Sequence, residues 1–142
     1  MRASSHELAL ALAQRIGTVL PPPLTAAASG PHVELHADGA RVGGSAAAAI
    51  ADEEDDRTFA ERVETATLAV LSTLQDDVAE YLTVEWPREA DGAMALPGAR
   101  VAGGRVHLWF GRSESAPAVG FDPIPCPGWR RTPGRPGRAG RT

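Results

Sequence analysis

Residues 58–82, TFAERVETATLAVLSTLQDDVAEYL, decide the fold of this chain. Thr58, with Glu61 three residues later, matches the capping box that begins many helices. Behind it, apolar residues return every three or four positions, the spacing that places them on one face of an α-helix. The pattern predicts one continuous amphipathic helix over residues 59–82. Its apolar face consists of Phe59, Val63, Ala66, Val70, Leu71, Leu74, Val78, Tyr81 and Leu82.

A shorter helix is expected near the N-terminus, because Leu8, Leu12 and Ile16 show the same helical spacing. Three consecutive prolines at residues 21–23 end this helix, since proline has no backbone N–H to donate within a helix. We interpret residues 21–31 as a loop.

Between the two helices, residues 32–37 alternate strictly between polar and apolar side chains, which is the pattern of a half-buried strand. Asp38-Gly39 follows, a pair typical of a two-residue hairpin turn because both residues tolerate positive φ. A return strand is therefore expected over residues 40–43.

After the long helix, short extended segments alternate with turn signals rich in glycine and proline. In one of them Val106, Leu108 and Phe110 alternate with polar positions, so they should face the core and Trp109 the opposite side. The extended segments are residues 99–102, 105–110 and 118–124.

These elements predict an α+β fold in the order α-β-β-α-β-β-β. We expect a two-layer sandwich in which the two main helices cover one face of an antiparallel sheet of about five strands. Residues 1–127 would form this single domain. Residues 128–142 would form a flexible, disordered tail rich in Gly, Pro and Arg.

Charge is divided unequally between these two parts. Residues 1–127 contain 9 Arg and 18 Asp or Glu, a formal charge of 9 − 18 = −9, whereas the tail contains five Arg and no acid. Such a tail fits contact with the phosphates of a nucleic acid. The chain has no Lys, so a compositional preference for Arg explains the tail equally well. The candidate polyanion-binding residues are Arg130, Arg131, Arg135, Arg138 and Arg141.

Part of the tail, Gly134-Arg135-Pro136, resembles the centre of the AT-hook, a short motif that binds the minor groove of DNA. The resemblance covers only this triplet. The motif has an arginine before it, where this chain has Pro133, so only one of the two arginine arms is present. Phosphate contact therefore explains the tail better than base recognition.

Histidines are the candidate metal ligands or catalytic groups. His32, Glu34 and His36 would share one face of a strand, and His107 is a further candidate. A rise of about 3.3 Å per residue separates His32 and His36 by about 13 Å, too far to bind one ion. The acidic run at residues 52–56 lacks the spacing and glycine of a calcium loop.

Hydrolase and nucleotide-binding motifs are missing from the sequence. The leading interpretation is therefore a small non-catalytic protein-binding or adaptor module without a cofactor, with a chaperone-like role as one form of it. Tryptophan is enriched at contact surfaces, so Trp109, His107 and Trp86 are the candidate partner-binding residues. The partner would be a second copy, giving a homodimer, or another protein. The alternatives are a nucleic-acid-associated protein that uses its tail, and a metal-binding protein or enzyme that uses the strand histidines.

A single cysteine, Cys126, allows no internal disulfide and gives no sign of an oxidising compartment. No apolar stretch approaches the roughly 20 residues that span a bilayer. We therefore expect a cytoplasmic protein without a membrane partner.

Overall fold

The structure is a computed structural model that describes residues 3–47 and 58–126. Both helices expected from the sequence are present, and the long one has the predicted bounds. The predicted tail and the acidic run at residues 52–56 lie outside the described residues. The elements in chain order are α1 (Ala3–Gly17), β1 (Leu24–Ser29), β2 (His32–Ala37), β3 (Ala40–Ala46), α2 (Phe59–Leu82), β4 (Pro97–Ala102), β5 (Arg105–Phe110), β6 (Val119–Gly120) and β7 (Ile124–Pro125).

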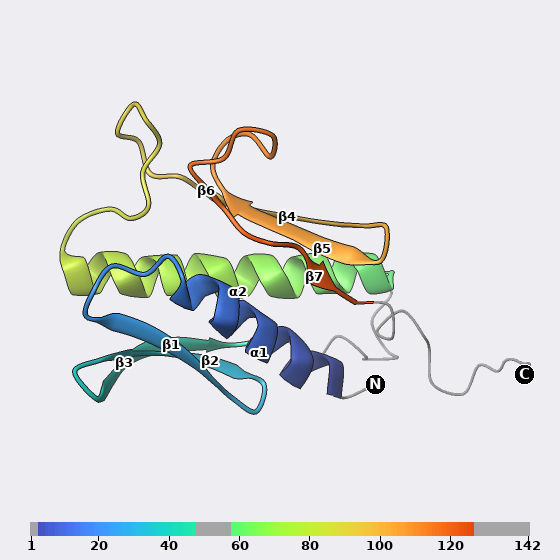
Figure 1. Cartoon of the computed structure of the whole chain (residues 1–142), viewed down its shortest axis with the longest axis horizontal. Helices are drawn as coiled ribbons and strands as arrows, with labels where there is room; N and C mark the ends of the chain where they lie inside the picture. Colours follow the sequence, from blue (N-terminus) through green and yellow to red (C-terminus); the bar gives the residue numbers. More distant parts are fainter. Residues whose placement is uncertain (1–2, 48–57, 127–142) are drawn as a thin grey trace, which may run out of the picture.

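The predicted fold class is confirmed: two helices combine with antiparallel strands in an α+β protein. In detail, the strands divide into two sheets instead of one. The first sheet has the order β1-β2-β3, and the second has the order β4-β5-β6, with β7 also pairing with β5. Figure 1 shows that the helices lie between the two sheets, so each sheet has helices on one face only.

The interpretation of residues 21–31 as a loop is wrong for Leu24–Ser29, which form β1. This segment, LTAAAS, is rich in alanine, a residue depleted in strands. It is extended because every one of its residues pairs with β2 across the tight turn at Gly30 and Pro31. Pairing between strands therefore overrides the local preference of this segment.

The start of α2 confirms the predicted capping box. The backbone N–H of Glu61 donates to Oγ1 of Thr58 at 3.1 Å, and the backbone N–H of Thr58 donates to Oε1 of Glu61 at 2.9 Å. The helix buries a wide part of its circumference, from Val63 to Val78. It can therefore pack against both sheets, and buried residues of both sheets and both helices form one continuous core.

Two carboxylates of α2 contact the edge strands of the two sheets. Oδ2 of Asp77 accepts the N–H of Gly44 in β3 at 3.0 Å, and Oε2 of Glu64 accepts the N–H of Val101 in β4 at 2.8 Å. The close approach to β3 depends on Gly43, where an added Cβ would lie 2.6–2.8 Å from the Asp77 side chain. Side chains of the helix thus accept one outward N–H group at the edge of each sheet.

Neither of the two described helices combines the length and apolar character needed to cross a bilayer.

Candidate protein-binding site

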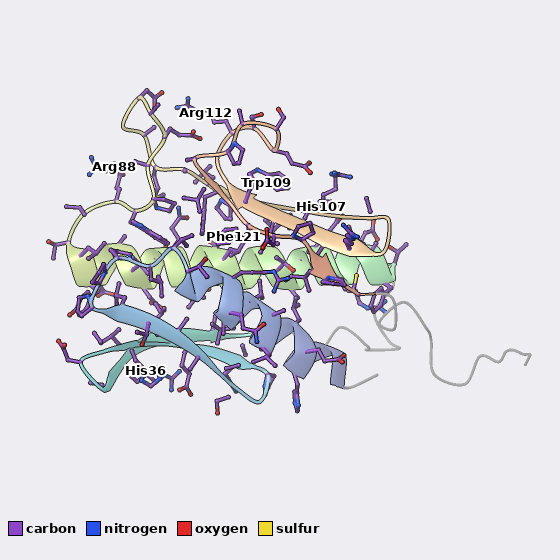
Figure 2. The ribbon with its side chains drawn as sticks, viewed as in Figure 1. His36, Arg88, His107, Trp109, Arg112 and Phe121 are labelled. Carbon is purple, nitrogen blue, oxygen red and sulfur yellow. The ribbon has the colours of Figure 1, made fainter. Side chains whose placement is uncertain are left out.

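Strand β5 has the predicted alternation. Val106, Leu108 and Phe110 are buried, whereas His107 and Trp109 are half-buried on the opposite, outer face. Figure 2 shows Trp109 and His107 on the second sheet, away from the first. This outer face is where the sequence placed the partner contact.

The indole of Trp109 lies close to the neighbouring strand because the residue paired with it is a glycine, which has no side chain. Trp109 pairs with Gly98 of β4, and a Cβ added at Gly98 would lie 2.3–2.6 Å from atoms of the indole ring. Only a glycine allows the ring to lie this close to the neighbouring strand. The indole therefore packs directly against the backbone of β4 at Gly98.

The edge strand that pairs with the other side of β5 contains a β-bulge. Trp109 pairs with Gly120 in β6, and Val106 pairs with Ile124 in β7. Between these pairs, two residues of β5 face three residues of the edge, numbers 121–123. β6 and β7 are therefore one edge strand that an extra residue interrupts, and such bulges redirect side chains and backbone groups.

An arginine of α1 fixes the bulge. Nε of Arg15 donates to the backbone oxygen of Asp122 at 2.8 Å, and one terminal nitrogen donates to the backbone oxygen of Pro123 at 2.9 Å. The other terminal nitrogen donates to the backbone oxygen of Ala11 at 3.3 Å, within α1 itself. The bulge turns two carbonyls away from β5, and Arg15 provides their hydrogen-bond donors.

Two hollows lie on either side of the bulge and share Gly120, Phe121 and Asp122. We call the two hollows together the bulge groove. The first hollow, of about 310 Å³, lies over β5 and is also lined by His107, Leu108, Trp109, Glu114 and Pro117. The second, of about 360 Å³, lies beside the end of α1 and is also lined by Gln14, Arg15 and Thr18.

The first hollow contains two carboxylates and no arginine. Arg100 donates to both oxygens of Glu114, at 2.8 Å and 2.7 Å. These hydrogen bonds, and then the charge of Arg100, lower the pKa of the Glu114 carboxyl below its ordinary value. Asp122 is exposed, and in the described structure its carboxylate has no hydrogen bond or ion pair. Because the Glu114 carboxylate is already paired with Arg100 and the Asp122 carboxylate is not paired, Asp122 supplies the available negative charge.

The structure brings together two of the three predicted partner-binding residues. His107 and Trp109 line the first hollow, whereas Trp86 packs on the inner side of the sheet. The Trp86 ring meets the buried Phe110 ring edge-on, with centroids 5.7 Å apart and an interplanar angle of 63°. Trp86 therefore does not line the groove.

Sequence reasoning missed Arg15, Phe121 and Asp122. One signal for the bulge was present in the sequence: the apolar positions change from odd numbers, Val119 and Phe121, to an even number, Ile124. Such a change of phase within one extended segment is what an extra residue produces. For Arg15 no local signal exists, since its partner Asp122 lies 107 residues away.

The histidine candidates lie on opposite sides of the molecule. His32, Glu34 and His36 occupy the outer face of the first sheet, where Nε2 of His36 lies 3.1 Å from Oε1 of Glu34. His107 belongs to the second sheet, across the helices from His36 (Figure 2). Over residues 3–47 and 58–126, no three side chains of His, Cys, Asp or Glu are grouped to hold a metal ion.

The five tail arginines proposed to bind polyanions, Arg130 to Arg141, lie outside the described residues. Comparison of the chain with protein-family models, with curated proteins and with solved structures gave no match. The argument for function therefore depends on the groove itself.

Proposed function

We propose that this chain is a small, non-catalytic protein-binding module whose bulge groove holds a basic side chain from an extended segment of a partner protein. One observation carries the proposal: the indole of Trp109 and the unpaired carboxylate of Asp122 line the same hollow. In this proposal the protein is cytoplasmic, which its single cysteine supports.

A basic side chain fits both kinds of group in the hollow. The face of an indole attracts a guanidinium or ammonium group, by roughly 0.5–1 kcal/mol at an exposed site. A carboxylate beside the ring adds an ion pair, and the indole offers further apolar contact for the methylene stem. The formal charge of −9 on residues 1–127 also attracts a basic partner over longer distances.

An extended segment that crosses the edge strand suits the groove, because the two hollows lie on either side of the bulge and share Phe121. One side chain of the partner would enter the hollow beside Trp109. The neighbouring part of its backbone would reach the second hollow, where Gln14 and Thr18 offer polar groups.

Chemical-shift titration of the indole N–H signals with N-acetylarginine amide tests this proposal. The signal of Trp109 should move saturably, at millimolar concentrations of the probe, whereas that of Trp86 should not because its ring packs against Phe110. N-Acetylglutamine amide is the matched neutral probe and should have little effect. Asp122→Asn should weaken binding about two- to fivefold, as expected for an exposed ion pair.

Asp38→Asn is the control, because it removes an exposed aspartate from the hairpin turn of the first sheet. Equal shifts with the arginine and glutamine probes would refute the basic side chain as the ligand. An unchanged affinity in the Asp122→Asn protein would show that this carboxylate does not contribute to binding.

A further inference from the structure

The outer edge of β1, in the first sheet, is a second surface that the bulge groove does not include. β1 pairs with β2, and no described strand lies along its other side. Figure 1 shows β1 at the border of the first sheet, with β3 at the opposite border beside α2. An inference about this edge goes beyond the function proposed above.

The pairing with β2 determines which backbone groups of β1 point outward. The N–H of Leu24 donates to the oxygen of Pro21 at 3.0 Å, so Leu24 and its partner Ala37 do not exchange hydrogen bonds. Bonded and non-bonded pairs alternate along an antiparallel ladder. The N–H and C=O groups of Ala26 and Ala28 therefore point away from β2, and they have no protein partner in the described part of the chain.

β1 itself contains no charge, proline or bulge, three of the features that normally prevent pairing with another chain, although α1 packs against this strand. Each of the other three edges of the described sheets is blocked in part. Asp77 and Glu64 of α2 accept edge N–H groups of β3 and β4. The β6–β7 edge has its bulge, together with Pro123 and Pro125, which have no N–H to donate.

We propose that β1 pairs with β1 of a second copy of this chain, antiparallel and around a two-fold axis at Ala27, so that two three-stranded sheets become one. In this register Ala26 stands opposite Ala28 of the partner subunit. The outward groups identified above then exchange hydrogen bonds at both symmetry-related pairs, as a bonded antiparallel pair requires.

The sequence of β1 is self-complementary in this register. Thr25 and Ser29 lie two residues to either side of Ala27, so Thr25 of each subunit stands opposite Ser29 of the other. Such pairs hydrogen-bond across strands. The same surface serves both subunits, which is the property of a closed two-fold interface. β1 contains no charged residue, so pairing two copies of this strand brings no like charges of β1 together, although the chain as a whole is acidic.

A charge-exchange experiment at Ala27 tests the pairing. Its side chain is exposed on the outer face of the sheet, so Ala27→Lys and Ala27→Glu change no buried contact. Sedimentation velocity over a concentration series should show a dimer for the wild type. Each variant alone should dimerise about two- to fivefold more weakly, because like charges meet at the axis. An equimolar mixture should restore the dimer as a heterodimer.

Ala40→Lys, on β3 of the same sheet, is the matched control and should leave the dimer intact. Hydrogen exchange gives a second measurement: the amides of Ala26 and Ala28 should be protected increasingly as the protein concentration rises. A wild type that stays monomeric would overturn the proposal, as would a dimer that Ala27→Lys leaves unchanged. A mixture that fails to form the heterodimer would overturn pairing around Ala27. Binding of the arginine probe at the groove should be the same in all these variants.

Discussion

The two sheets lie on either side of the same helices, yet they differ in the regularity of their outer edge strands. The first sheet is formed by two tight hairpins, and its outer strand β1 is regular and contains no charge, proline or bulge. The second sheet has an outer strand that a bulge interrupts, and an arginine of α1 holds the bulge in place. The regular edge can accept another strand, whereas the irregular edge cannot. The same irregularity forms the groove beside Trp109.

This difference concerns only the edges, because both sheets share one core with α2. Leu35→Ala in the first sheet and Phe110→Ala in the second should each lower the free energy of unfolding by roughly 2–5 kcal/mol. Both side chains are almost completely buried in the common core, so either variant should destabilise the whole described structure in a single transition. Urea titrations followed by far-UV circular dichroism and by tryptophan fluorescence measure this.

Leu10→Ala is the control for these two variants, because Leu10 is 52% exposed on α1 and its truncation should cost less than about 0.5 kcal/mol. The tryptophans whose positions are described, Trp86 and Trp109, report on the second half of the chain, whereas circular dichroism reports on all of it. Transitions that separate between the two methods in the Leu35→Ala protein would show that the sheets unfold independently. That result would contradict a single domain over residues 1–127.

The sequence predicts the elements of the common core well because their signals are local. A long apolar stripe behind a capping box is sufficient to place α2, and strict alternation is sufficient for β2 and β5. The same alternation places Trp109 and His107 on the outer face of the second sheet. Local patterns therefore predict the position of two residues that line the bulge groove.

The remaining features depend on contacts between distant parts of the chain. β1 has few residues that favour strands, and it becomes extended only by pairing with β2. Asp77 and Glu64 connect α2 to the edges of the two sheets, although in the sequence these carboxylates look like ordinary solvent-facing residues. Arg15 reaches a segment 107 residues later. No periodicity within one element indicates contacts of this kind.

Arg15 connects the first half of the chain to the bulge, so its replacement should affect the second sheet more than the first. Arg15→Gln removes the hydrogen bonds to the carbonyls of Asp122 and Pro123 and should lower the free energy of unfolding by about 1–3 kcal/mol. Arg15→Lys should lie between the wild type and Arg15→Gln, because one ammonium group cannot reproduce the planar arrangement of donors. Urea denaturation gives the magnitude.

The matched control for Arg15 is the same substitution in the first sheet, Arg41→Gln. Arg41 is exposed, and within the described residues it donates only to the oxygen of Gly43, two residues away, at 3.3 Å. Its replacement should change stability by less than about 0.5 kcal/mol. Hydrogen exchange should also show faster opening at residues 119–125 in the Arg15→Gln protein than in the Arg41→Gln protein. Equal exchange there would mean that Arg15 does not hold the bulge.

The smallest expected difference between the two sheets is their response to acid. The second sheet and its loops contain two exposed arginine–carboxylate pairs, Arg100 with Glu114 and Arg112 with Asp91. Hydrogen bonds, from Arg100 to Glu114 and from Ala93 and Arg112 to Asp91, lower the pKa of each carboxyl below its ordinary value. A lowered pKa in the folded state means that these carboxylates stabilise the protein above their unfolded pKa. That stabilisation is lost as the pH falls through the lower, folded pKa.

The pair of Arg100 and Glu114 provides the measurement, because Arg100→Gln removes the main cause of the shift, leaving the charge of His107 as a weaker one. The melting temperature of the variant should lie below that of the wild type at pH 7. The gap should close as the pH falls below about 4.5, the ordinary Glu value, because protonation of Glu114 then breaks the pair in the wild type as well. Arg105→Gln on β5 is the control, since Arg105 has no ion pair within the described residues and should give no gap that depends on pH. A gap for Arg100→Gln that stayed constant into acid would show that this arginine acts through packing, and the charge pairs would then no longer distinguish the second sheet from the first.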